Sequence, residues 1–168
     1  MDNFCCSIKE KEVYPIVIKF NNKRYLTLYY YTEPSDSLLH KNSKSILCFH
    51  SIDDMNKFCQ KNGLIKNGDT EDDEIFEYDF DEPIKNPLNY SEILDKWNLL
   101  NTIANIFGMF FEGDLRKYNA VYNFLFRLST PIEPIPPTLF INKKYLEKIL
   151  KVFRKRSRFL NNFEFYVD

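Results

Sequence analysis

The stretch VYPIVIKFNNKRYLTLYYYT, residues 13–32, decides the fold. Its first part, residues 13–20, is an apolar run around Pro15, and residues 24–32 are rich in Tyr, Leu and Thr. Asn21 and Asn22 separate the two runs, and asparagine tolerates the left-handed backbone that a tight hairpin turn requires. We therefore predict a β-hairpin in this stretch.

A short strand and a helix are expected after the hairpin. Residues 33–44 are polar and typical of a loop, and residues 45–50 form a short apolar strand. Ser51 can cap the following helix, with Asp54 in the capping-box position, and Gly63 can end it. The side chains of this helix expected to be buried are Met55, Phe58 and Cys59.

A second strand with an acidic outer face is predicted at residues 75–80. Side chains alternate across a strand, so Phe76, Tyr78 and Phe80 share one side. The other side is then acidic, with Glu77, Asp79 and Asp81 facing away from the core.

The second half of the chain is mainly helical. Ser91 is the expected cap of a long helix that buries Trp97 and ends at Gly108. Asp114 is the expected cap of the next helix, which stops before Pro131. We expect both helices to pack against the sheet.

The last part of the chain contains a stiff connector, a helix and a strand. The proline-rich residues 131–137 cannot form regular helix, because proline lacks the backbone N–H and clashes with the preceding turn. Asn142 can cap the last helix, and residues 163–167 can close the chain as a strand. The economical prediction is one α+β domain over residues 1–168, with a mainly antiparallel sheet and about four helices packed on it.

Composition supports a soluble protein of the cytoplasm. The chain has 168 residues, within the usual range for one domain, and begins without the apolar run of a secretory signal. No stretch has the length and apolar character of a membrane-spanning helix. The cysteines Cys5, Cys6, Cys48 and Cys59 lack metal-ligand spacing, and we expect reduced, mostly packed thiols.

Charge is segregated along the chain, although the net charge is only −1. Residues 69–82 hold nine acids and no base, whereas residues 143–158 hold eight bases and one acid. Carboxylates fixed on a strand can attract a basic partner in place of nucleic acid phosphates. We therefore predict that the partner-binding residues are Asp69, Glu71, Asp72, Asp73, Glu74, Glu77, Asp79, Asp81 and Glu82.

Other interpretations of the charged blocks stay open. The acids can simply form a solvated edge or pair with the basic helix, within one chain or across two subunits. The basic helix can instead bind nucleic acid, in which case the phosphate contacts come from Lys148, Lys151, Arg154, Lys155, Arg156 and Arg158. A solvated helix face whose bases complement the helix dipole is the simpler account of those residues.

Catalysis has little support in the sequence. His50 lies beside Ser51 and near Cys48, but this spacing does not establish a nucleophile and a base. No Gly-rich phosphate loop or zinc-protease motif is present, and the acidic block lacks the central glycine of a calcium loop. We expect no enzymatic activity, no metal site and no cofactor.

Three segments resemble a family of bacterial immunity proteins, the inhibitors of contact-dependent growth inhibition systems. These segments are FEYDF at 76–80, ILDKWNLLNTIANIFGMFFEG at 93–113 and YNAVYNFLF at 118–126. The resemblance depends on Trp97, Asn98 and Leu99, on Phe111 with Gly113, and on residues 122–126. It implies a cytoplasmic protein that binds and neutralises a cognate toxin domain, often a nuclease, without a cofactor or turnover.

Overall fold

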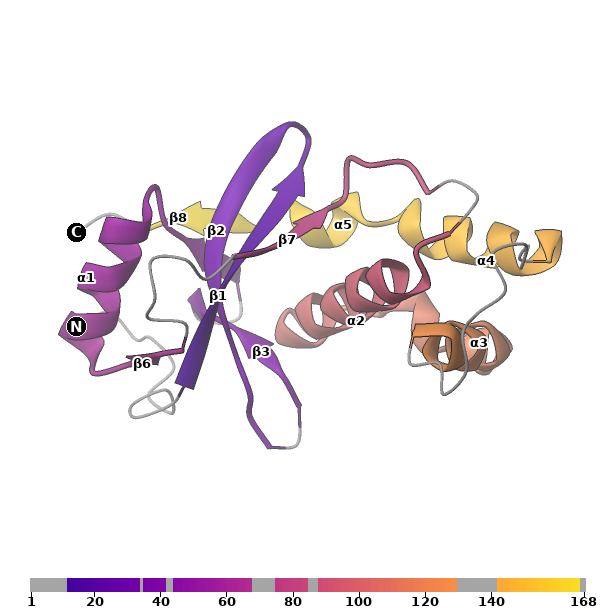
Figure 1. Ribbon diagram of the computed structural model, residues 1–168, viewed down its shortest axis with the longest axis horizontal. Helices are drawn as coiled ribbons and strands as arrows, with labels where there is room; N and C mark the ends of the chain where they lie inside the picture. Colours follow the sequence, from indigo (N-terminus) through magenta and orange to yellow (C-terminus); the bar gives the residue numbers. More distant parts are fainter. Residues whose placement is uncertain are drawn as a thin grey trace.

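The computed structural model describes residues 12–33, 35–41, 44–67, 75–84, 88–129 and 142–166. Strands occupy the middle of the molecule (Figure 1), with one helix on one side of them and the remaining helices on the other. The α+β fold class predicted from the sequence is confirmed.

The predicted hairpin is the centre of the larger sheet. It consists of β1 (Glu12–Phe20) and β2 (Lys23–Tyr30), which pair antiparallel from Val13 opposite Tyr30 to Phe20 opposite Lys23. Asn21 and Asn22 form the turn with φ angles of 53° and 58°, in the left-handed region that asparagine tolerates. Three short strands complete the sheet: β3 (Ser37–Leu38), β6 (Ile65–Lys66) and β7 (Phe76–Asp79).

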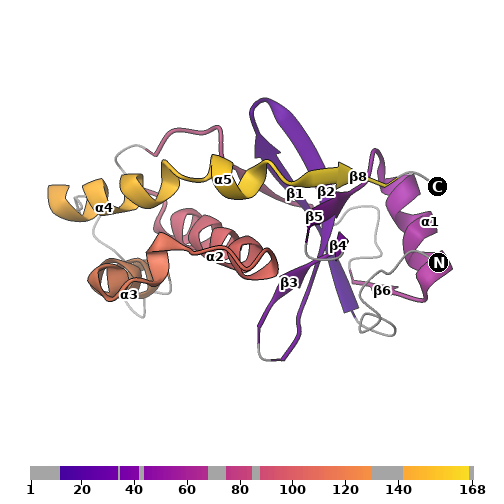
Figure 2. The same ribbon diagram turned by 180° about the vertical axis from the view of Figure 1, so that it is seen from behind.

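Both sheets mix parallel and antiparallel pairs. In the larger sheet β3 pairs antiparallel with β2, whereas β6 and β7 pair parallel with β1. In the smaller sheet β5 (Ser45–Cys48) lies between two partners (Figure 2), antiparallel to β4 (His40–Lys41) and parallel to β8 (Phe163–Phe165). The C-terminal strand therefore joins a sheet built from the first third of the chain.

The helix α1 (Ile52–Asn62) forms as its caps predict. The Ser51 hydroxyl accepts the backbone N–H of Asp54, and Gly63 ends the helix with a φ of 66°. Met55, Phe58 and Cys59 are buried against side chains of the strands, including Leu28 and Tyr30 of β2. This cluster fixes α1 on one face of the larger sheet.

The long helix α2 (Tyr90–Ile106) begins two residues earlier than its predicted cap implies. Its cap is Asn89, whose side chain accepts the backbone N–H of Glu92, so the assignment of Ser91 as the cap is wrong. Ser91 lies inside the first turn and donates its hydroxyl to Asp95. Trp97 is 2% exposed, as predicted for a core residue.

The predicted cap at Asp114 is also wrong. Asp114 ends the short 3-10 turn η1 (Glu112–Asp114), a second turn η2 (Arg116–Tyr118) follows, and α3 (Asn119–Ser129) begins only then. The tight turns bring Gly113 so close to Trp97 and Phe111 that a Cβ atom there would lie within 3 Å of both rings. Packing against Trp97, rather than a cap at Asp114, determines the backbone conformation of this part of the chain.

The helices α2 to α5 lie together on the other side of the sheet (Figures 1 and 2). Asn142 caps α4 (Lys143–Phe153) as predicted, and α5 (Ser157–Leu160) leads into β8. Only α2 of the two predicted sheet-packing helices lies against the strands, beside β3, whereas α3 packs on α2. The proline connector at 131–137 lies outside the described residues.

One large core joins these helices to the sheet. It contains Ile16, Ile18 and Phe20 of β1, and on the helix side it includes Trp97, Leu100, Leu125 and Ile149.

Among the described helices, none combines the length and apolar character that crossing a membrane requires.

Candidate functional site

The acids of β7 lie beside cations of the hairpin. Because β7 pairs parallel with β1, Asp79 is opposite Lys19, and the Lys19 Nζ atom lies 2.6 Å from its carboxylate. Glu77 forms an ion pair with Arg24 of β2, also at 2.6 Å. These two carboxylates, predicted to attract a partner, are therefore engaged by the chain itself.

Asp81 stabilises the hairpin turn. Its two carboxylate oxygens accept the backbone N–H groups of Asn21 and Asn22, each at 2.8 Å. Glu82 is exposed, and its backbone N–H and that of Asp81 both bond to the Asp79 carboxylate. Five of the nine predicted binding residues lie outside the described residues: Asp69, Glu71, Asp72, Asp73 and Glu74.

The environment of Asp79 favours its charged form. Burial by itself raises the pKa of this carboxyl, but the hydrogen bonds from Lys19 and from the backbone N–H groups of Asp81 and Glu82 outweigh it, and the net pKa is lowered. Asp79 therefore contributes to the stability of the fold as a carboxylate.

A second acidic cluster, which the sequence analysis missed, lies in a groove of about 500 Å³ on the other side of β7. We call it the tyrosine groove, because four tyrosines line it together with two carboxylates: Tyr29, Tyr31, Tyr78, Tyr122, Asp36 and Asp95. The rest of the described lining consists of serine, threonine, asparagine and one leucine, and none of these described residues is Lys, Arg or His.

Five elements position the groove. The end of β2 and the loop before β3 form one wall, where the Tyr29 and Tyr31 rings meet edge to face with centroids 5.3 Å apart. The outward face of α2 forms the opposite wall, because Asp95, Asn98 and Thr102 recur at helical spacing on the side away from Trp97. β7 and α3 add the remaining tyrosines.

The electrostatics of the groove are negative and unbalanced. Burial raises the pKa of Asp95, and the nearby Glu92 carboxylate adds to the shift while the bond from Ser91 opposes it. Burial together with the carboxylates of Asp95 and Asp36 raises the pKa of Tyr78 to about 12. Neither aspartate belongs to an ion pair within the part of the chain that is described.

One buried hydrogen-bond acceptor without a partner belongs to a residue that lines the groove. Tyr122 donates its hydroxyl to Asn98 Oδ1 at 3.0 Å, which leaves that amide oxygen satisfied. Asn101 Oδ1 is buried and has no hydrogen-bond partner. A buried acceptor without a donor is costly to the folded state.

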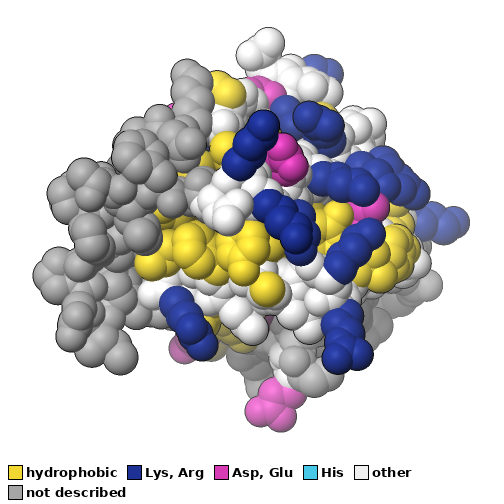
Figure 3. All heavy atoms as spheres, turned by 90° about the vertical axis from the view of Figure 1, so that its right-hand side faces the viewer, with side chains coloured by type: hydrophobic (Ala, Val, Ile, Leu, Met, Phe, Trp, Pro, Cys, Tyr) yellow, Lys and Arg dark blue, Asp and Glu magenta, His cyan; other side chains and the backbone are white. Residues whose placement is uncertain are grey.

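The basic residues predicted to bind nucleic acid lie on α4, in the turn after it and on α5, and those of α4 belong to the end of the molecule formed by α3 and α4 (Figure 1). Figure 3 shows Lys and Arg side chains around a strip of hydrophobic side chains on this end. Lys148 donates to the backbone carbonyl of Lys117, and Lys155 forms an ion pair with Glu112 at 3.1 Å. Lys151, Arg154 and Arg158 are exposed and form no ion pair within the described residues.

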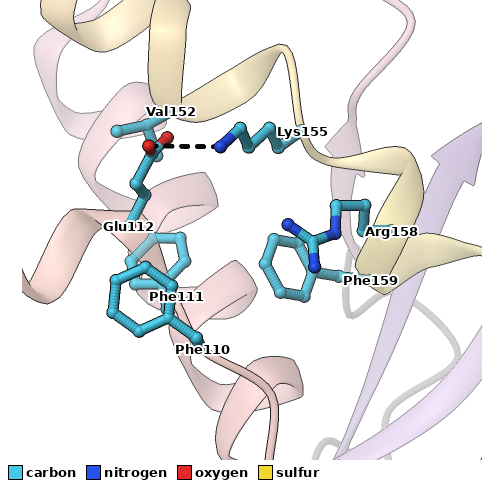
Figure 4. A pocket seen from close by; sticks show the side chains of 7 residues that line it. All are labelled: Phe110, Phe111, Glu112, Val152, Lys155, Arg158 and Phe159. Carbon is cyan, nitrogen blue, oxygen red and sulfur yellow. Dashed lines mark ion pairs between the residues drawn. The ribbon is translucent and has the colours of Figure 1, made fainter.

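A small hollow opens at the edge of this basic end (Figure 4). Phe110, whose side chain is 63% exposed, and Phe111 line one side of it, and Arg158 and Phe159 of α5 line the other. Lys155 and Glu112 meet above it. An exposed aromatic ring beside two cations is a chemically distinct surface from the tyrosine groove.

The residues considered for catalysis have structural roles. The His50 ring stacks on Phe165 with centroids 4.3 Å apart, and Ser51 caps α1. Burial raises the pKa of the Cys48 thiol well above its ordinary value, which disfavours the reactive thiolate. Among the described residues, no group of three His, Cys, Asp or Glu side chains has the arrangement of a metal site.

Comparison with known proteins identifies a similar fold. No protein-family model matches the chain, and no curated protein shows significant sequence similarity to it. A solved structure, the crystal structure of the SatS C-terminal domain in complex with bromine, is similar over 92% of this chain and 94% of that domain. The TM-score is 0.55 at 16% sequence identity, so the similarity concerns the fold alone.

Proposed function

We propose that this chain is an immunity-type inhibitor that binds a basic toxin domain in the bacterial cytoplasm and neutralises it through the tyrosine groove. The observation that carries the proposal is the groove itself: a concave, negative surface lined by four tyrosines and, among the described residues, by no cation. The sequence resemblance to immunity proteins supplies the class of partner. Inhibition by occupying a surface of the toxin requires no cofactor and no turnover.

The side chains of the groove are those that protein interfaces favour. Tyrosine offers a large, rigid contact area at a low cost in conformational entropy, and asparagine and serine add adaptable hydrogen bonds. Unpaired carboxylates attract a basic partner and accelerate its association. On the acidic strand, by contrast, Asp79 and Glu77 already have cationic partners, so the groove is the better supported contact surface.

The test is capture of a partner from the host cell. The tagged chain is exposed to lysate in which the gene immediately upstream of its own is expressed, at moderate salt, and captured proteins are identified by mass spectrometry. We expect one basic protein fragment in stoichiometric amount. A variant with Asp36→Lys and Asp95→Lys should lose it, because the charge of the groove is reversed.

The matched control is a double variant with Asp53→Lys and Glu147→Lys. Both residues are exposed acids on helices outside the groove lining, so the change in net charge is the same. The control should still capture the fragment. Equal capture by the two double variants, or no basic fragment with the unmodified chain, would contradict the proposal.

The basic end of the molecule supports a second candidate function, an accessory role in binding single-stranded nucleic acid. The supporting observation is the exposed Phe110 ring beside Lys155 and Arg158, since aromatic stacking and phosphate contacts are the usual means of such binding. Fluorescence anisotropy with a labelled single-stranded oligonucleotide tests it. Phe110→Ala should weaken binding at all salt concentrations, whereas Arg158→Gln should also flatten its salt dependence. Binding that neither change affects would exclude this surface.

A further inference from the structure

We infer that the tyrosine groove receives an arginine side chain of the partner, with the guanidinium paired to Asp95 and lying against the tyrosine rings. This inference rests on the proposed function, since it specifies what the partner inserts. Three features of the groove support it: its hydrogen-bond acceptors, its tyrosine rings, and the absence of a cation among the described residues that line it.

The first argument is the balance of donors and acceptors. Asp36 and Asp95 provide carboxylate oxygens, of which the Asp36 carboxylate accepts one hydrogen bond from the Tyr29 hydroxyl. A guanidinium carries five N–H donors and no acceptor. It can therefore satisfy a carboxylate with two parallel hydrogen bonds.

The second argument concerns the aromatic walls. Tyr29 and Tyr31 stand edge to face on one wall, and Tyr78 projects into the groove from β7. Cations are attracted to the faces of aromatic rings, and arginine makes such contacts more often than lysine. A planar guanidinium can stack on one tyrosine while its edge reaches a carboxylate.

The third argument is the state of Asp95. Its carboxylate is partly buried beside the like charge of Glu92, and the Ser91 hydroxyl, 3.5 Å away, is its hydrogen-bond donor. Within the described part of the chain, no lysine, arginine or histidine lines the groove to balance its charge. A guanidinium is less strongly hydrated than an ammonium group, so it loses less on entering a partly buried site.

The test uses small probes in place of the partner. Nα-acetyl-arginine amide is titrated into the full chain while the tyrosine ring signals are followed by NMR. Two matched probes are titrated in parallel: the lysine derivative, which keeps the charge, and the citrulline derivative, which keeps the shape without the charge. The arginine probe should shift the signals of Tyr29, Tyr31, Tyr78 and Tyr122, with binding about tenfold tighter than either matched probe.

Variants locate the binding. Asp95→Asn should weaken the arginine probe about tenfold, whereas Glu77→Gln, on the opposite face of β7, should leave its affinity unchanged. NMR signal dispersion confirms that each variant is folded. Shifts outside the groove, equal affinity for citrulline, or equal affinity for lysine would overturn the inference.

A negative result in the probe experiment and a negative result in the capture experiment contradict different proposals. If a basic fragment is captured but the arginine probe does not bind, the chain is an inhibitor that uses other chemistry, and the arginine inference is wrong. If the probe binds the groove but no protein is captured, the arginine site stands and the immunity-type function is wrong.

Discussion

The strand β7 and the tyrosine groove both carry partly buried carboxylates, but the groups that surround these carboxylates differ. Asp79 on β7 receives hydrogen bonds from Lys19 and from two backbone N–H groups. Asp95 in the groove has a serine hydroxyl at 3.5 Å, and no cation among the described residues that line the groove. A carboxylate that pairs with a cation of its own chain is part of the fold, whereas one without such a cation is available to a basic partner.

Trp97→Ala should have the largest effect, because it removes the support that both α2 and the groove share. The Trp97 ring lies within 6.4 Å, centroid to centroid, of four aromatic rings, including that of Tyr122. We expect a loss of about 3–5 kcal/mol in the free energy of unfolding, as for other large core truncations. Chemical denaturation followed by circular dichroism measures it, and an unchanged midpoint would mean that α2 is not held by this residue.

Asp81→Ala should show that the acids near β7 are structural. The change removes two charge-assisted hydrogen bonds to the hairpin turn, and we expect a loss of about 1–2 kcal/mol. Partner capture by the folded variant should not change. Glu82→Ala is the control, since its side chain is exposed, and it should stay within about 0.5 kcal/mol of the unmodified chain. Equal losses in the two variants would remove the structural role assigned to Asp81.

The pH dependence of stability should have opposite signs in the two regions. The folded pKa of Asp79 is lowered from 3.8, so its stabilising effect is present above that pH and is lost as pH falls through the folded pKa. The folded pKa of Asp95 is raised from 3.8, so ionised Asp95 reduces stability as pH rises above that value.

Asparagine variants of Asp79 and Asp95 test this difference in the pH dependence of stability. At pH 7, Asp79→Asn should lower the melting temperature and Asp95→Asn should raise it. Both differences should shrink at about pH 3, where the unfolded carboxyls are mostly protonated. The groups facing Asp95 are Ser91, Glu92, Tyr78 and Asp36, and neither variant changes them. Shifts of the same sign at pH 7 would contradict the comparison.

Glu77→Gln should have the smallest effect. Its ion pair with Arg24 is largely exposed, with 68% of the arginine side chain accessible, and exposed pairs contribute about 0–1 kcal/mol. We expect a change below about 0.5 kcal/mol and no change in partner capture. Loss of capture in this variant would restore the acidic strand as the contact surface.

The sequence predicted those elements whose signals are local. Asn21 and Asn22 mark the hairpin turn, and Ser51 and Gly63 are the caps at the two ends of α1. The strands β7 and β8 are confirmed at predicted positions. Their parallel pairing and the strand β6 are not predictable in this way, because the partners are distant in the chain and no short turn fixes the register. The caps at Ser91 and Asp114 were misplaced because a better cap, Asn89, and packing around Gly113 compete with them.

The candidate site could not be predicted from the sequence for a similar reason. A count of charges along residues 69–82 cannot show that β7 lies beside Lys19 and Arg24, which neutralise part of the block. The groove combines side chains from segments throughout the chain, so no contiguous motif marks it. The available signals were the three consecutive tyrosines at 29–31 and the polar residues Asp95, Asn98 and Thr102 at helical spacing.

The central claim is that the partner binds the groove and not the acidic strand, and calorimetric titration of the captured fragment tests it most directly. Three forms of the chain are compared: unmodified, Asp36→Asn with Asp95→Asn, and Glu77→Gln with Glu82→Gln. The groove variant should bind about 100-fold more weakly, since a buried charge of the partner loses its counterion, and the strand variant should bind within about twofold of the unmodified chain. Weak binding by the strand variant with unchanged binding by the groove variant would contradict the account.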